Sequence, residues 1–209
     1  MDTNEITKIL QDEIETGILG PGIVLKQEML AERFGVSRQP IRQVLERLLT
    51  HGLLTKRSDR SLAVNGLSAK EVRNLSQIRI SLEAMALSLA IPHLVPRDLR
   101  KARRLNEDLQ EEDSPSTIEE LDIAFHQTLY APCNNPRLVQ MIMDLRREAR
   151  RSYYRQPKGS WSRAAFYKEH EALLNACADG NVEHAVSILM THIGITSGNL
   201  VQANDIGEP

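Results

Sequence analysis

The sequence predicts a mostly α-helical protein in two parts, of which the first ends in a small β-hairpin and the second is an all-helical bundle of about six helices. Apolar residues recur at helical spacing along most of the 209 residues. A strand pattern is found in only one stretch, "LLTKRSDRSLAVNG", where two apolar runs flank a polar middle. With 41% hydrophobic and 26% charged residues, the composition is that of an ordinary globular protein.

The predicted domain boundary lies directly after Gly66, where the character of the sequence changes. The sequence "SAKE" (Ser68–Glu71) has the pattern of a capping box and opens a long expected helix to about residue 90. Five more helices are expected at about 97–112, 117–130, 136–154, 161–178 and 182–199. We therefore expect domains at 1–66 and 67–200, followed by a disordered tail at 201–209.

The first 66 residues predict three helices and then the hairpin, which is the arrangement of a winged helix-turn-helix. The first two helices are expected at about 4–16 and 27–34, and the third is expected to have His51 in its last turn and to end at Gly52. Gly35 permits a tight turn before the third helix, and Ser37 can cap that helix. The apolar residues expected to face inward from the second and third helices are Met29, Leu30, Phe34, Ile41, Val44, Leu45, Leu48 and Leu49.

A compact basic patch covers the third helix and the hairpin. Between residues 33 and 60 there are seven Lys or Arg and two Asp or Glu, so this stretch carries 7 − 2 = +5 in a chain of net charge −2. Such a patch favours a polyanionic partner. Side chains early in the third helix can enter a major groove, where arginine pairs with guanine and glutamine with adenine. The candidate DNA contacts are Ser37, Arg38, Gln39, Arg42, Arg57 and Arg60. The alternative is a solvated basic face over an aliphatic core.

Four residues of the second part form a possible set of metal ligands. The sequence "LDIAFH" places Asp122 and His126 one helical turn apart on the same face. His170 and His192 lie among apolar neighbours on later helices. One carboxylate and three imidazoles suit a borderline divalent ion. The alternative is that each histidine is an ordinary buried residue, because spacing in the sequence does not make the four meet in space.

The N-terminal stretch "LAERFGVSRQPIRQVLERLLTHGLL", with its lead-in "GILGPGIVLKQEML", resembles the DNA-binding domain of GntR-type bacterial transcription repressors over about residues 5–66. The resemblance implies that Ser37, Arg38, Gln39 and Arg42 contact double-stranded operator DNA. Two features depart from the family pattern. Glu28 stands where some members carry an arginine, and the hairpin reads "SDRSLAV" without the usual glycine.

The C-terminal part is similar to the FCD ligand-binding domain of the FadR subfamily, and its expected six helices favour the shorter VanR-like variant. The resemblance rests on a D-x3-H motif, on "EH" in "KEHEALLNACADGNVEHA", and on a histidine late in the last helix. It implies that Asp122, His126, His170 and His192 bind a divalent metal ion, with Zn, Ni and Mn as the candidates.

The same resemblance implies a small carboxylate effector beside the metal, held by a cation of the protein. Arg79 is the first candidate for this cation, and Arg146 and Arg150 are the second. For Arg79 the alternative is an ion pair with Glu83, four residues along the helix. For Arg146 and Arg150 the alternative is a solvated helix face.

These observations together predict a cytoplasmic, homodimeric transcription regulator, most simply a repressor, and not an enzyme. Its expected partners are operator DNA and a small carboxylate metabolite, with no membrane, because no apolar run approaches the roughly 18 residues needed to span a bilayer. Cys133 and Cys177 are expected to be reduced core residues. The alternatives are a metal-responsive regulator without an organic effector and an Asp/His3 metalloenzyme.

Overall fold

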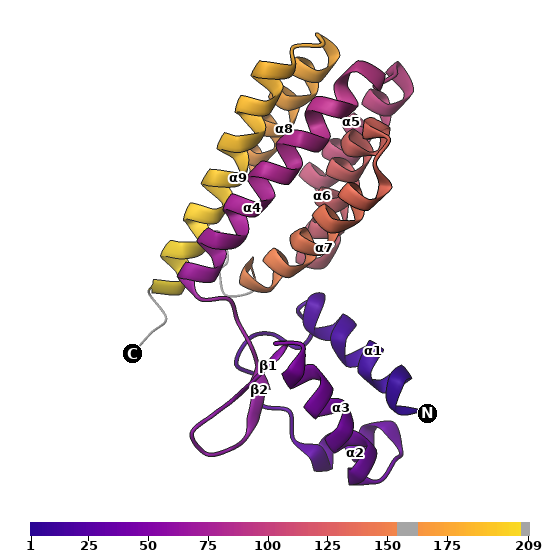
Figure 1. Ribbon diagram of the computed structural model, residues 1–209, viewed down its shortest axis with the longest axis vertical. Helices are drawn as coiled ribbons and strands as arrows, with labels where there is room; N and C mark the ends of the chain where they lie inside the picture. The colour runs from indigo at the N-terminus through magenta and orange to yellow at the C-terminus, as the bar shows by residue number, and fades with distance from the viewer. Residues whose placement is uncertain (154–162, 206–209) are drawn as a thin grey trace. The chain divides into compact units, whose positions relative to one another are not determined.

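The protein divides into two compact units, the first made up mainly of Met1–Leu67 and the second mainly of the residues from Ser68 onward. The computed structural model (Figure 1) describes residues 1–153 and 163–205, with the side chains of these residues except 115, 116, 150–153, 163 and 199–205. The predicted fold class is confirmed, because helices dominate both units and the strands form one two-stranded sheet within the described residues.

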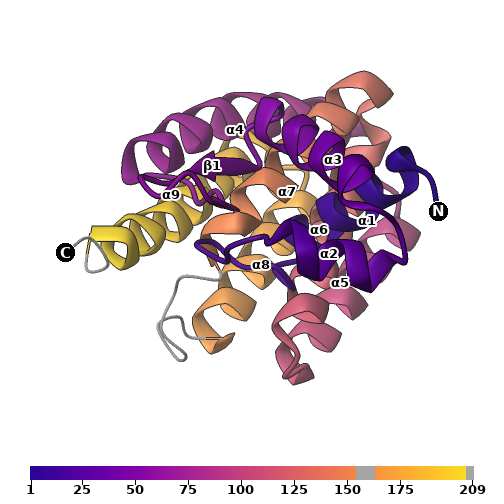
Figure 2. The ribbon, with the colours of Figure 1, turned by 90° about the horizontal axis from the view of Figure 1, so that it is seen from below.

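The first unit has three helices followed by a hairpin, as the sequence predicts. Its elements are α1 (Thr3–Glu15), α2 (Gln27–Phe34), α3 (Arg38–Thr50), β1 (Leu54–Lys56) and β2 (Leu62–Val64). Figure 2 shows α1, α2 and α3 gathered on one side of this unit. A capping box of Asp2 and Glu5 starts α1, and Gly35 ends α2 with a φ of 63°. Glycine meets this left-handed geometry at little cost.

The core of the first unit is aliphatic and comes mainly from α1 and α3. Its fully buried members include Ile6, Leu10, Ile41, Val44 and Leu48. Two side chains expected to face inward do not, since Met29 is 64% exposed and Leu49 is 36% exposed. Each directly follows or precedes a buried leucine, and adjacent residues on a helix point about 100° apart. The buried face predicted from helical periodicity is therefore one residue too wide on α2 and on α3.

The hairpin forms without glycine, by an arrangement that the sequence pattern did not predict. Arg60 adopts a φ of 65°, the left-handed region that glycine usually occupies. The Arg57 amide donates to the Ser61 carbonyl at 2.9 Å, which closes the turn. The Asp59 carboxylate accepts from the Ser61 amide at 2.9 Å and from its hydroxyl at 2.6 Å. These bonds fix the turn around the strained residue.

The second unit contains six α-helices in the described part of the chain, in agreement with the prediction. They are α4 (Ala69–Ala90), α5 (Pro96–Glu111), α6 (Pro115–Tyr130), α7 (Pro136–Tyr153), α8 (Arg163–Ala178) and α9 (Val182–Asp205), with 3-10 turns at Ile91–His93 and Ala131–Cys133. The helix α4 lies along α9, and α5 packs against both α6 and α8 (Figure 1). One apolar core joins these helices, so their inward faces are held in a fixed arrangement.

Two helix ends differ from the prediction. The helix α6 begins at Pro115 with Ser114 as its N-cap, before the expected start at 117. Proline needs no amide partner in the first turn and is favoured there. The helix α9 continues to Asp205, so residues 201–205 of the expected disordered tail are helical, and 206–209 lie outside the described residues.

Cys133 and Cys177 are both buried free thiols. None of the helices searched among the described residues is long and apolar enough to cross a membrane.

Candidate metal centre

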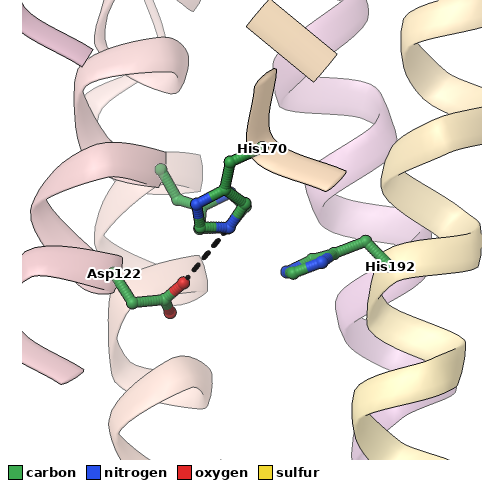
Figure 3. A group of neighbouring side chains, drawn as sticks. Asp122, His170 and His192 are labelled. Atoms are coloured by element: carbon green, nitrogen blue, oxygen red, sulfur yellow. Dashed lines mark ion pairs between the residues drawn. The ribbon is translucent and has the colours of Figure 1, made fainter. Parts of the chain in front are cut away.

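The four predicted ligands come together in the core of the second unit. Asp122 and His126 lie on α6, His170 on α8 and His192 on α9, and one ligand atom from each lies within 4.8 Å of the others. Figure 3 shows Asp122, His170 and His192 converging from three helices. The three imidazoles are buried, and the Asp122 side chain is 20% exposed. Helical spacing brings the first pair together, whereas packing of α8 and α9 against α5 and α4 brings in the others.

The protonation of His170 follows from its neighbour Asn106. The Asn106 Nδ2 amide donates to the Tyr167 carbonyl and to Glu171 Oε1, at 3.2 Å each. Its other atom, Oδ1, is therefore an acceptor, and it lies 3.1 Å from His170 Nδ1. Nδ1 must carry the proton, which leaves Nε2 of His170 with a free lone pair.

A parallel argument applies to His126. The Tyr130 hydroxyl donates to Glu83 Oε2 at 2.7 Å, so towards His126 Nδ1, 3.1 Å away, it can only accept. His126 Nδ1 is therefore the protonated nitrogen, and Nε2 again carries the lone pair. At His192 the same outer position is taken by Glu169, whose Oε2 lies 2.6 Å from Nδ1. Each imidazole is thus held at Nδ1 by a hydrogen-bond acceptor, as is usual for histidines that bind metal ions.

Three acceptor atoms then face one another without a donor. Among the described residues, the buried polar side-chain atoms that lack a hydrogen-bond partner are Asp122 Oδ1, His126 Nε2 and His170 Nε2. Asp122 Oδ1 lies 3.5 Å from both imidazole nitrogens. Burying such lone pairs unpaired costs roughly 1–3 kcal/mol for each group. A cation among them would satisfy all three, and the donor set of one carboxylate and three imidazoles fits a divalent ion.

Protonated histidines do not supply this missing positive charge. Burial lowers the pKa of His126 and of His170 well below the usual range, and positive charge from neighbours such as Arg146 lowers both further. The distances to Asp122 could be taken for ion pairs, but an imidazole with so low a pKa is neutral near pH 7. The contacts are therefore between three lone pairs.

A buried ion network adjoins the four ligands, with Glu83 of α4 at its centre. Arg79 donates from Nε to Glu83 Oε1 at 2.8 Å, and Arg146 donates from Nε and Nη2 to Glu83 Oε2 at 2.9 and 2.6 Å. Burial alone would raise the pKa of Glu83, but Arg146 and Arg79 lower it to about 2. Arg146 also donates from Nη1 to Asp122 Oδ2 at 3.0 Å. Arg146 thereby fixes one Asp122 oxygen and leaves the other facing the histidines.

The structure places two of the three expected effector arginines beside the centre. Arg79 forms the ion pair with Glu83 that the sequence offered as the alternative, and the bond comes from its Nε. Arg146 is 4% exposed, so it does not belong to a solvated helix face. The side chain of Arg150 lies outside the described residues.

The sequence does not predict the roles of four residues that surround the ligands, namely Tyr130, Asn106, Glu83 and Glu169. Tyr130 follows His126 by four residues, so the i, i+4 spacing that joined Asp122 to His126 could have been extended one more turn. Asn106 is a fully buried polar residue on the apolar face of α5, a signal that the sequence did contain. Glu83 appeared only as the partner of Arg79, and Glu169 only as the neighbour of His170. Nothing local predicted that either would reach the ligand cluster.

The expected DNA contacts all lie exposed in the first unit. Ser37 is the N-cap of α3, but within the described residues its hydroxyl makes no capping hydrogen bond. Arg38 pairs with Glu28, and Arg42 pairs with Glu46 at 3.0 Å. Such exposed pairs are worth little and can be exchanged for other partners. Gln39 of α3 and the hairpin residues Arg57 and Arg60 are exposed as well.

The depressed pKa values predict how the metal-free protein responds to acid. Below about pH 6.5 the unfolded chain binds protons at His126 and His170 that the folded chain does not, so the free energy of unfolding should fall as the pH decreases. Urea denaturation of chelator-treated protein between about pH 5 and pH 8 measures this dependence. A His184→Gln variant, altered at an exposed histidine, should keep the wild-type dependence, and a His170→Gln variant should show a shallower one. A stability independent of pH in this interval would contradict the assignment.

Comparison with known proteins agrees with both parts of the structure. Residues 2–64 match the gntR family of bacterial regulatory proteins, and residues 74–194 match the FCD domain. The HTH-type transcriptional regulator McbR of Escherichia coli (strain K12) is 30% identical over 146 residues, 68% of this chain and 66% of that protein. The HTH-type transcriptional repressor RspR of the same strain is 33% identical over 132 residues, 60% of this chain and 56% of that protein. In these alignments the chain spans less than two thirds of either relative.

A solved structure extends the likeness over nearly the whole chain. The structure of E. coli McbR/YncC covers 96% of this chain and 97% of its own, with a TM-score of 0.75 and 26% identity. The matched gntR family consists of bacterial regulatory proteins and the relatives are transcription regulators, which confirms the prediction of a regulator and not an enzyme. With a gntR-type domain at its N-terminus and an FCD domain covering more than half of its length, this chain belongs to the gntR family as a DNA-binding transcription regulator.

Proposed function

We propose that this regulator binds operator DNA under the control of a small organic acid, and that the acid binds beside a divalent metal ion in the FCD domain. The observation that carries the proposal is the set of three buried acceptor atoms without a donor, on Asp122, His126 and His170. A cluster of this kind is costly unless a cation satisfies it. Asp122, His126, His170 and His192 would hold the ion.

Acid binding requires a positive environment that is still open to a ligand. A divalent ion held by these four residues would supply an open coordination position for an anionic oxygen. Arg79 is the better protein partner for the acid, because Arg146 already donates to both Glu83 and Asp122. Arg79 contacts Glu83 through Nε alone in the described structure, so its terminal nitrogens remain for the carboxylate.

The DNA-binding side of the proposal rests on the exposed N-terminal end of α3. We assign base reading to Arg38 and Gln39, and phosphate contact to Ser37, Arg42 and the hairpin arginines Arg57 and Arg60. A homodimer would present two such helices to a two-fold symmetric operator. Repression is the simplest outcome, and the name of the relative RspR as a repressor supports it.

A second candidate function is favoured by the outer hydrogen bonds of the histidines. Because Tyr130, Asn106 and Glu169 already orient the three imidazoles, the metal ion itself could be the signal, with no organic acid. The two functions differ in what changes the affinity for operator DNA. In the second, metal alone has the full effect; in the first, the metal-loaded protein still responds to an acid.

Purified protein should carry about one divalent ion per chain, because the described residues offer one four-ligand set. His170→Ala should lower the metal content and the melting temperature together, since metal binding is coupled to folding. His184→Ala, which alters an exposed histidine outside the cluster, should change neither. Elemental analysis and thermal melts provide the two readouts. Metal-free protein from a chelator-free preparation would exclude the site.

Arg38 and Arg42 should differ in how they affect DNA binding. Arg38→Ala is expected to weaken operator binding by about 1–3 kcal/mol and to relax specificity at one base pair. Arg42→Ala should weaken binding to operator and random DNA alike, and should reduce the salt slope by about one unit. Titrations of both variants against both DNAs at several salt concentrations make the comparison. The base-reading assignment fails if the Arg38 variant keeps wild-type operator affinity.

Acid and operator should oppose each other in binding. A 100-fold weakening of operator binding by the acid corresponds to a coupling of about 2.7 kcal/mol, and linkage requires operator DNA to weaken acid binding by the same factor. Calorimetric titration of the acid into the free protein and into the protein–operator complex measures both sides. Equal acid affinities in the two titrations would remove the acid as the signal and favour the metal-sensing function.

A further inference from the structure

We propose that the effector site accepts acids with one negative charge and discriminates against those with two, and that Glu83 is the residue that sets this limit. The inference rests on the proposed function, since it assumes that an acid binds at the metal centre. It adds the charge class of the acid and a specificity-determining residue that does not itself contact the metal-ligand atoms.

The charges of the described residues around the centre lead to this limit. Three carboxylates, Glu83, Asp122 and Glu169, surround the histidines, and they face two guanidinium groups, those of Arg79 and Arg146. With a divalent ion bound, these groups together leave a single positive charge. One carboxylate of a ligand neutralises it, and a second would be in excess.

Among the side chains that the structure describes, a second carboxylate would also lack a cation to bind. Arg146 uses Nε, Nη1 and Nη2 on Glu83 and Asp122, and it is 4% exposed. Arg79 donates to Glu83 through Nε, and its remaining N–H groups would bind the first carboxylate of the acid. Like charges in a buried site repel strongly, because little water is present to screen them.

Neighbouring charges outside the cluster, as far as the structure describes them, do not alter this balance. Arg103 pairs with Glu171 at 3.5 Å, so the two cancel. Lys168 lines a groove of about 310 Å³ with Glu169 and His192 on the surface between α8 and α9, but it is exposed and its charge is screened by water. Among the described residues, the net charge that an acid meets is therefore set by the two arginines and three carboxylates of the cluster.

Glu83 is the decisive residue because it is fully buried and neutralises the arginines from within. Its two carboxylate oxygens accept hydrogen bonds from both guanidinium groups and from the Tyr130 hydroxyl. Glu83 itself is 0% exposed. Glutamine at this position would keep the shape and an acceptor oxygen but remove one negative charge. The arginines would then carry charge that a second ligand carboxylate could use.

The test uses pairs of acids that differ by one carboxylate, lactate with tartronate and gluconate with glucarate. Calorimetry and thermal shift are measured on metal-loaded protein, because binding to the folded state raises its apparent stability. In the wild type we expect the monoacid of a pair to bind roughly tenfold or more tightly than its diacid, from a single additional like-charge contact. Glu83→Gln should reduce or invert that ratio.

Two further variants keep the test decisive if Glu83→Gln fails to fold. Glu169→Gln removes a charge from a partly exposed position, and its amide oxygen can still accept a hydrogen bond from His192. This variant should also reduce the ratio of monoacid affinity to diacid affinity. Glu183→Gln removes an exposed charge from the first turn of α9 and should leave the ratio unchanged. Metal content is measured for every variant, so that loss of the ion is distinguished from a change in acid preference.

The outcomes separate the inference from the function on which it rests. The inference is supported if the wild type binds monoacids more tightly than diacids. This preference should be lost in Glu83→Gln or Glu169→Gln and kept in Glu183→Gln. Diacids that bind the wild type as well as their monoacids overturn the charge limit and leave the acid-responsive function standing. If no acid of either pair binds the metal-loaded protein, both the inference and the acid-responsive function are overturned in favour of metal sensing.

Discussion

The contact of the Glu83 carboxylate with two arginines determines the geometry of the rest of the centre. Glu83 is fully buried, and its charge is tolerable only because Arg79 and Arg146 lie within hydrogen-bonding distance. The same arginine that neutralises Glu83 orients Asp122, and the same carboxylate oxygen that binds Arg146 accepts the Tyr130 hydroxyl that fixes His126. Removing one partner of such a pair typically costs about 3–5 kcal/mol, because the other charge is left buried alone.

This network also connects helices that are distant in sequence. Glu83 lies on α4, Asp122 on α6 and Arg146 on α7, and the ion pairs join all three. Only Ser68 separates Leu67, where the main segment of the first unit ends, from α4, and Ser68 forms the capping box of this helix with Glu71. The ion pairs of the centre are therefore anchored on the helix that follows the first unit. In the function that we propose, these contiguous contacts would carry the coupling between acid and operator.

The fold could be predicted well because most of its signals are local. Capping residues, prolines and helical spacing set the ends of α2, α3, α4 and α7 to within a residue or two. The pair Asp122 and His126 was equally accessible, since four residues on a helix bring two side chains to one face. The family resemblance then supplied His170 and His192, whose meeting with the pair depends on tertiary packing that spacing alone does not encode.

Other features depend on contacts across long sequence separations. Glu83 and Arg146 are 63 residues apart, and Asn106 and His170 are 64 apart, so local pattern could not join them. The face of Arg146 was ambiguous for the same reason, because a row of arginines on a helix resembles a solvated surface until one of them is seen to be buried. The continuation of α9 to Asp205 was missed because its last residues lack strong apolar periodicity.

The hairpin turn has a consequence for how the first unit meets a nucleic acid. A glycine at its tip would sample many conformations in the free protein and lose them on binding. Arg60 in the left-handed region, held by the Arg57–Ser61 hydrogen bond and braced by Asp59, has few conformations to lose. If the loop contacts DNA as we propose, the strain in the free state would be offset by a smaller entropic penalty on association. In the phosphate contact that we propose for Arg57 and Arg60, the basic loop would approach the duplex already shaped, and would position the domain by fit more than by adaptation.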